Sequence, residues 1–153
     1  MYPAARRAVY KMCRLARWND VMSKLDKSGN LTDVAAKLGI GSYHRHVFLC
    51  VGDECCSDEV GQEAWAALKA ELKEKNLSLS AGPNACYRTK ADCLRVCQQG
   101  PVAVVYPDGT WYANLTADRI PLFVQQHLIE GRPVAAWTFA RNPLPNGEDA
   151  KAT

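Results

Sequence analysis

The chain has 153 residues, of which 48% are hydrophobic and 23% are charged, which is typical of one globular domain that can bury its own core. The 19 Lys and Arg residues exceed the 16 Asp and Glu residues by too little to indicate nucleic-acid binding. No apolar run approaches the roughly 18 consecutive residues of a membrane span. These features exclude a disordered chain, a coiled-coil rod and a membrane-spanning protein. We therefore expect a cytoplasmic protein with no nucleic-acid or membrane partner.

The charge is divided unevenly along the chain. Residues 1–40 contain eight Lys or Arg and three Asp, a net charge of +5, whereas residues 41–153 contain eleven basic and thirteen acidic residues, a net charge of −2. The glycines around Ile40 mark the change in composition and indicate a linker. The sequence therefore predicts three parts: a helical N-terminal extension (1–41), an α/β domain (42–140) and a flexible tail (141–153).

The N-terminal part has helical periodicity. Apolar residues recur near helical spacing at Val9, Met12 and Leu15, which predicts a basic amphipathic helix. A second short helix is predicted to begin at Thr32 as its N-cap and to end at Gly39.

From residue 44 the pattern changes to alternating strands and helices. The apolar run 46–51 predicts a buried strand, and the spacing of Val60, Ala64, Leu68 and Leu72 predicts an amphipathic helix. A second, short strand is expected at residues 85–89.

The C-terminal half contains a hairpin and a helix. Residues 102–106 (VAVVY) form an apolar, valine-rich run that predicts a strand. The Pro-Asp-Gly turn at 107–109 follows, and residues 110–113 return as a strand. Thr116 is expected to cap a last helix that continues to about Glu130. This order predicts an α/β fold: a small thioredoxin-like sandwich of about four strands and two main helices.

Seven cysteines are many for this length, and the number is odd. A secreted disulfide framework favours an even count and a signal peptide, and the Arg-rich N-terminus does not have the form of one. In a reducing compartment, cysteines at these positions indicate metal ligands, cluster ligands or redox thiols.

Two cysteine pairs are predicted to lie in loops at the ends of strands. Cys50 and Cys55 have four residues between them, and Cys93 and Cys97 have three. Four thiolates suit either zinc or an iron–sulfur cluster. Zinc pairs usually have closer spacing, whereas a two-iron cluster, in which each iron takes two thiolates, accommodates wider and unequal gaps. Gly100 would let the backbone approach the sulfurs, and Pro101, through a cis bond, would fix the entry to the next strand.

Four segments together resemble a known family. They are the early Cys-x₄-Cys after a strand, the segment 92–101 (DCLRVCQQGP), the segment 105–112 (VYPDGTWY) and the segment 127–134 (HLIEGRPV). They resemble the thioredoxin-like 2Fe-2S ferredoxins, which are also similar to the 2Fe-2S subunit of NADH dehydrogenase. The resemblance extends over about residues 45–135.

The resemblance implies a 2Fe-2S cluster bound by Cys50, Cys55, Cys93 and Cys97. It also implies a one-electron carrier, not an enzyme, that acts between a reductase and an oxidoreductase partner. Homodimers are known in the family, so a homodimer is one expected state. The chain departs from the family in two respects: Cys56 directly follows Cys55, which leaves the second ligand open between the two, and residues 1–40 lie outside the family core.

Three other functions compete with electron transfer. A thiol–disulfide oxidoreductase of this fold needs two cysteines separated by two residues, and the sequence has no such pair. A structural zinc-binding protein that holds the ion with four cysteines and binds partners remains an alternative, as does a dedicated iron–sulfur subunit of a multi-subunit dehydrogenase or hydrogenase. The acidic residues between 53 and 59 would attract a basic partner over long range.

Overall fold

The structure is a computed structural model, and it describes residues 30–78 and 84–145. The chain divides into two compact units, residues 1–36 and residues 37–153, and each is considered by itself. The helix predicted around Val9 and Leu15 lies outside the described residues. Helix α2 spans Leu31–Lys37, and the Asn30 side chain accepts a hydrogen bond from the Thr32 backbone N–H (3.2 Å). The predicted cap was therefore two residues late, because Asn accepts this bond as readily as Thr does.

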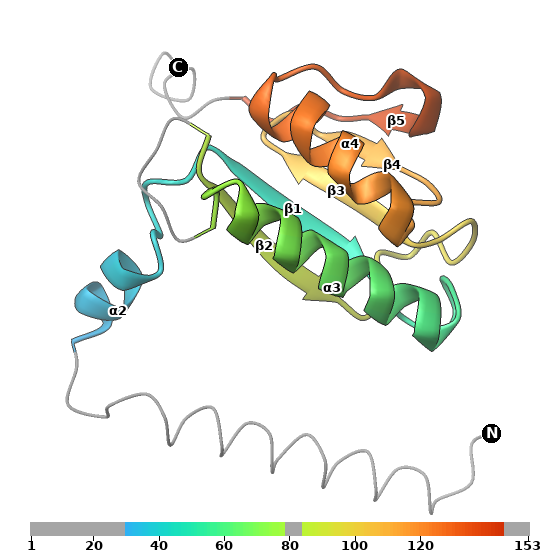
Figure 1. The fold of residues 1–153 in the computed structure, drawn as a ribbon, viewed down its shortest axis with the longest axis horizontal. Coiled ribbons are helices and arrows are strands. Elements are labelled where there is room, and N and C mark those ends of the chain that lie inside the picture. The colour runs from blue at the N-terminus through green and yellow to red at the C-terminus, as the bar shows by residue number, and fades with distance from the viewer. Residues whose placement is uncertain (1–29, 79–83, 146–153) are drawn as a thin grey trace, which may run out of the picture. The chain divides into compact units, whose positions relative to one another are not determined.

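A mixed five-stranded sheet forms the framework of the second unit (Figure 1). Its spatial order is β2-β1-β3-β4-β5, with β1 parallel to β2 and every other neighbouring pair antiparallel. The strands are β1 (Arg45–Cys50), β2 (Cys86–Ala91), β3 (Val102–Tyr106), β4 (Thr110–Tyr112) and β5 (Thr138–Arg141).

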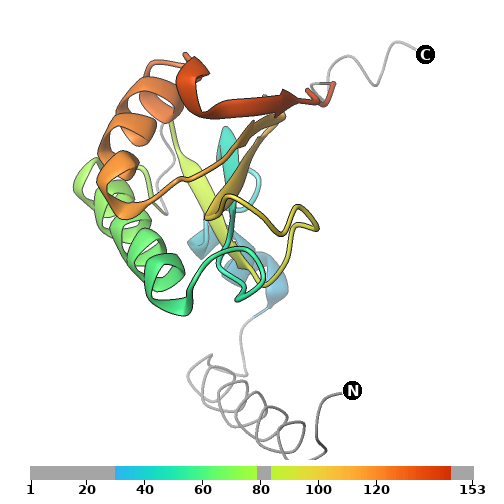
Figure 2. The same cartoon turned by 90° about the vertical axis from the view of Figure 1, so that its right-hand side faces the viewer.

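One face of the sheet is covered by helices (Figure 2). Helix α3 (Asp58–Glu74) begins at Ser57, whose side chain accepts a hydrogen bond from the Val60 N–H (3.4 Å). Alternate strand residues such as Val47 and Val105 point to this face and join the core with Leu68 of the helix. The buried strand and the amphipathic helix predicted from periodicity are both confirmed.

The last helical segment is less regular than the sequence predicts. It consists of a 3₁₀ turn (Ala117–Arg119), helix α4 (Ile120–Phe123) and a π-helical stretch (Val124–Ile129). The hydrogen-bonding pattern changes from α-helical to π-helical while Ile120, Phe123, Val124 and Leu128 stay buried, so the spacing of the apolar residues does not reveal the change. Pro121 occupies the first turn, as expected.

The fifth strand was not predicted. After a second 3₁₀ turn (Ala135–Trp137), β5 pairs with β4 at the edge of the sheet. Its four residues are mostly exposed, so they lack the apolar alternation by which a strand is recognised. Among the described helices, none is long and apolar enough to cross a membrane.

Candidate metal centre

The two cysteine pairs lie at the same end of the sheet. Cys50 is the last residue of β1 and pairs with Val102, the first residue of β3. Cys93 follows the end of β2, and Cys97 precedes β3. Because β1 and β2 run parallel and β3 runs in the opposite direction, the loops after β1 and β2 and the entry to β3 meet at one edge (Figure 1).

The first pair is buried. Cys50 is 2% exposed and Cys55 is 8% exposed, and their two thiols lie within hydrogen-bonding reach of each other. Burial raises the pKa of the Cys55 thiol to about 12, and the Val102 backbone N–H counteracts this by hydrogen bonding. The pair and Val102 form an apolar cluster against Leu94, Val96 and Trp111.

The second pair is exposed and closely spaced. The Sγ atoms of Cys93 and Cys97 are 3.8 Å apart, and the Arg95 N–H donates to Cys93 Sγ (3.2 Å). Two thiolates bound tetrahedrally to one metal at about 2.3 Å are themselves about 3.8 Å apart. The hydrogen bond with Cys93 raises the pKa of Cys97. The separation of this pair therefore fits two sulfur ligands of one iron.

Gly100 joins the two cysteine loops. Its N–H donates to the Cys55 carbonyl oxygen (3.1 Å), and a Cβ added at this position would lie 2.3 Å from Cys55 Sγ. Only glycine allows so close an approach of backbone to sulfur. This is the approach expected from the sequence, and the Gly100–Pro101 peptide bond is cis, also as expected.

A second glycine packs the first loop against the end of β2. A Cβ at Gly52 would lie 1.9 Å from the Asp92 carbonyl oxygen, and the same oxygen lies 3.8 Å from Cys50 Sγ. The sequence patterns did not single out Gly52. Its position two residues after Cys50 was the one sequence feature that could have indicated its role in packing the first cysteine loop.

Cys55 and Cys56 have different surroundings. Cys55 Sγ faces Gly100 and therefore the loop that carries the second pair, whereas a Cβ added at Gly61 of α3 would lie 3.2 Å from Cys56 Sγ. Burial raises the pKa of Cys56. The geometry favours Cys55 as the partner of Cys50, and the choice between the two cysteines stays a prediction.

The second loop contains three non-glycine residues in the left-handed region. These are Arg95, Cys97 and Gln99, with φ of 67°, 54° and 52°. Such angles are uncommon for residues with a Cβ and are maintained only where the surrounding structure holds them. The amino-acid types at these three positions do not predict a left-handed backbone conformation.

The four cysteines are brought together as two pairs. Within residues 30–78 and 84–145, no three His, Cys, Asp or Glu side chains are grouped closely enough to hold one metal ion. Cys50 and Cys97 are close enough to influence each other electrostatically. Two adjacent pairs of thiols, with backbone N–H groups aimed at two of the sulfurs, match the donor set of a two-iron cluster, in which each iron takes two thiolates.

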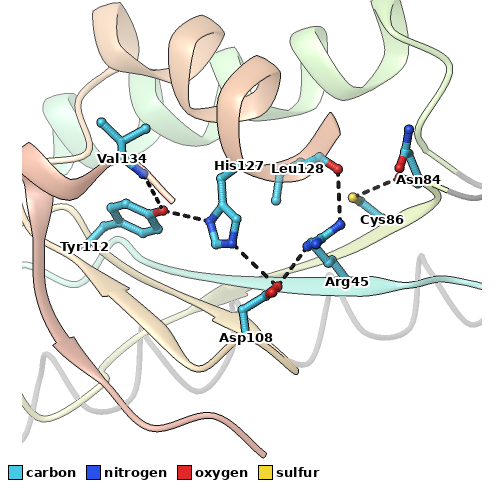
Figure 3. A network of polar contacts seen from close by, with 8 residues as sticks. All are labelled: Arg45, Asn84, Cys86, Asp108, Tyr112, His127, Leu128 and Val134. Carbon is cyan, nitrogen blue, oxygen red and sulfur yellow. Dashed lines mark hydrogen bonds and ion pairs between the residues drawn. The ribbon is translucent and has the colours of Figure 1, made fainter. Parts of the chain in front are cut away.

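The opposite end of the sheet carries a polar network that contains no cluster ligand (Figure 3). His127 is fully buried, and its Nδ1 atom lies 2.7 Å from the Tyr112 hydroxyl. Its Nε2 atom lies 3.5 Å from Asp108, which accepts a hydrogen bond from Arg45 Nε (2.8 Å). Burial lowers the pKa of His127 to about 4, so the ring is neutral at pH 7. The network anchors the β3–β4 turn to the helices.

No family model matches the chain. Among solved structures, it resembles a thioredoxin-like [2Fe-2S] ferredoxin from Aquifex aeolicus with a TM-score of 0.56 and 27% identity, over 68% of this chain and 97% of that one. A curated 2Fe-2S ferredoxin from Clostridium pasteurianum is 31% identical over 96 residues, which cover 58% of this chain and 89% of the relative. The chain belongs to the thioredoxin-like 2Fe-2S ferredoxin family.

Membership of the thioredoxin-like 2Fe-2S ferredoxin family confirms the resemblance and the fold class predicted from sequence. The curated 2Fe-2S ferredoxin from Aquifex aeolicus gives the same result, at 28% identity over 109 residues and 94% of its length. The matches cover 58% to 68% of this chain. The three predicted domain boundaries stay predictions.

Proposed function

We propose that the chain binds a 2Fe-2S cluster through Cys50, Cys55, Cys93 and Cys97 and works as a one-electron carrier between a reductase and an oxidoreductase partner. The geometry at Gly100 carries this proposal. Its backbone packs on Cys55 Sγ and donates a hydrogen bond to the Cys55 carbonyl oxygen, which joins the segment of the first cysteine pair to the loop of the second pair. When bound, the cluster would accept and release one electron at a time.

The residues of the chain would hold the cluster and limit the access of water to it. Cys50 and Cys55 lie beneath Leu94, Val96 and Trp111, so one side of the site is apolar. The N–H groups of Arg95 and Val102 donate to Cys93 and Cys55 sulfurs. Hydrogen bonds of this kind stabilise negative charge on sulfur and tune the reduction potential.

Two solved structures of one relative show a pair of cysteines with the spacing of the second pair here. They are variants of the Aquifex aeolicus [2Fe-2S] ferredoxin in which serine replaces one cysteine, and the two cysteines concerned lie four positions apart. Cys93 and Cys97 have the same separation.

The direct test is anaerobic purification with iron and sulfide determination and low-temperature electron paramagnetic resonance. We expect about two iron and two sulfide per chain, and a resonance from the reduced sample that accounts for about one unpaired electron. A colourless protein with one zinc per chain would identify a structural zinc protein instead. Constant copurification with larger oxidoreductase subunits would indicate a dedicated subunit.

A homodimer is the second part of the proposal. The sheet face opposite the helices carries an aromatic patch, here defined as Tyr43, His46, Phe48, Tyr87 and Tyr106. Each of these rings contacts at least one other ring of the patch. On strands β1, β2, β3 and β4, the positions facing this side include no Asp, Glu, Lys or Arg. An uncharged, aromatic-rich surface is characteristic of the core of a protein interface, which supports its contact with a second copy.

A further inference from the structure

We propose that a notch between the second cysteine loop and β5 receives an apolar side chain of the redox partner, and that this side chain is surrounded by Lys or Arg on the partner. The inference rests on the proposed electron-carrier function and names the surface at which the electron would be exchanged. It does not depend on the identity of the partner.

The notch lies beside the candidate metal centre. It has a volume of about 200 Å³ and is lined by Val96, Gln98, Gln99, Ala113 and Phe139. Three of these residues belong to the loop that carries Cys93 and Cys97. Val96 also packs against the apolar group of buried side chains formed by Cys50, Cys55 and Val102. A side chain seated in the notch would therefore contact residues that themselves contact the cysteines, and electron transfer requires such a short path.

Phe139 makes the notch an apolar contact site. It is 50% exposed, although it lies on a strand and has only Trp111 as a ring neighbour among the described residues, at 6.3 Å between ring centroids. Trp111 in turn packs against the buried cysteine pair. A large exposed apolar side chain beside an apolar hollow is a common feature of contact surfaces. Three of the five lining residues, Val96, Ala113 and Phe139, are apolar and none is charged, which fits an apolar occupant.

The charge expected of the partner is inferred from the two cysteine loops, the second of which lines the notch. Asp53 and Glu54 are exposed on the first cysteine loop, and Glu54 lies within electrostatic reach of Cys97. Asp92 is also exposed at the start of the second loop, where Arg95 is the cation. The net charge of these four residues is −2, from three carboxylates and one guanidinium. The two cysteine loops, one of which lines the notch, are therefore net acidic, which favours a cationic partner and disfavours acidic ones.

The experiment measures binding before electron transfer. The probe is cytochrome c, a lysine-rich haem protein, and both proteins are oxidised so that no electron moves. Isothermal titration calorimetry at low ionic strength compares the intact protein with Phe139→Ser and Glu54→Gln. We expect either substitution to weaken binding by about fivefold or more, the effect of losing an interface contact worth about 1 kcal/mol. Added salt should weaken the binding of cytochrome c to the intact protein more than its binding to Glu54→Gln.

Two matched controls accompany these variants. Leu122→Ser removes a side chain of equal exposure (49%) on α4, and Glu74→Gln removes an exposed carboxylate at the far end of α3. Both are expected to bind like the intact protein. No binding by the intact protein, unchanged affinity of Phe139→Ser, or an equal loss in Leu122→Ser would overturn the proposal.

A kinetic measurement completes the test. Dithionite supplies one electron to the cluster, excess reductant is removed, and on mixing this electron passes to the ferric haem, which becomes ferrous. The second-order rate constant at low salt should fall in Phe139→Ser by about the factor seen in affinity, with the resonance signal unchanged. A sample without a 2Fe-2S signal would contradict the proposed function, whereas a full signal with an unchanged rate in Phe139→Ser would contradict the notch alone.

Discussion

The sulfurs of Cys55 and Cys56, adjacent in the chain, face different parts of the molecule. Cys55 Sγ points to Gly100 and the second cysteine loop, and Cys56 Sγ points to Gly61. We predict that Cys55→Ser abolishes or strongly perturbs the cluster, whereas Cys56→Ser leaves it nearly intact. The measurement is iron content together with the visible and paramagnetic resonance spectra. The reverse result would assign Cys56 as the ligand.

The lowered pKa of the buried His127 leads us to predict that this residue makes a pH-dependent contribution to the stability of the fold. Burial and the positive charge of Arg45 lower its pKa, Asp108 raises it, and the resulting pKa is about 4 in the folded chain, against 6.5 for an unperturbed histidine. Because the unfolded chain takes up the proton first, the contribution is fully present above pH 6.5 and is lost as the pH falls towards 4. This pKa difference corresponds to a change of about 3 kcal/mol in the free energy of unfolding.

The measurement is urea unfolding followed by circular dichroism from neutral pH to about pH 4. His127→Gln should show a smaller decrease over this range than the intact protein. The exposed His44 provides the control, since His44→Gln should retain the full decrease. Equal slopes in all three proteins would show that another group causes the acid sensitivity.

At the level of loops and strands, the close approach of Gly100 to Cys55 predicts a specific sensitivity. Gly100→Ala would place a methyl group 2.3 Å from Cys55 Sγ and 2.5 Å from its carbonyl oxygen. We expect a loss of stability of about 1–3 kcal/mol and poor retention of iron, because backbone and sulfur cannot both move aside. Thermal unfolding and iron content report the two effects.

Gly41→Ala is the matched control for this substitution. An added methyl at Gly41 meets no atom within 4 Å, so its cost is limited to the left-handed φ of +98°. Iron retention should be unaffected. If Gly100→Ala behaved in the same way as Gly41→Ala, the two cysteine loops would not be packed as described.

The elements differ in how well the sequence predicts them. Strand β3 was predicted with its observed bounds because an apolar run rich in valine between two prolines leaves few alternatives. β5 was missed because an exposed edge strand has no buried face to produce a pattern. The two cysteine pairs were predicted from their spacing, and the assignment of all four cysteines to one cluster, which the family resemblance implies, stays a prediction. The left-handed residues Arg95, Cys97 and Gln99 were not, because tertiary contacts and not local propensity hold them.

At the scale of the whole molecule, the aromatic patch predicts self-association. Tyr87→Lys would introduce a charge into this uncharged surface and should shift the protein from dimer to monomer in analytical ultracentrifugation. Lys90→Glu changes a charge on the same strand but on the opposite face, so it should leave the dimer intact. A monomeric intact protein at micromolar concentration would contradict the dimer.

The division into two units predicts the result of truncation. Residues 37–153 form a compact unit that contains every candidate cluster ligand. A chain that begins at Lys37 is therefore expected to fold and to bind iron as the full chain does, with any loss restricted to contacts with a partner. Circular dichroism and iron content test this, and an unfolded product would show that the N-terminal residues belong to the folding unit.

The hydrogen bond from Gly100 to Cys55 has a consequence for the order of events during maturation. The two sites that it joins are distant in the chain and adjacent only after β1 and β3 have paired. A nascent polypeptide therefore presents two separate local pairs of thiols, and the set of four is complete only when these strands have paired. Binding of an inorganic centre across both pairs would stabilise that strand pairing, so that metal uptake and folding are thermodynamically coupled.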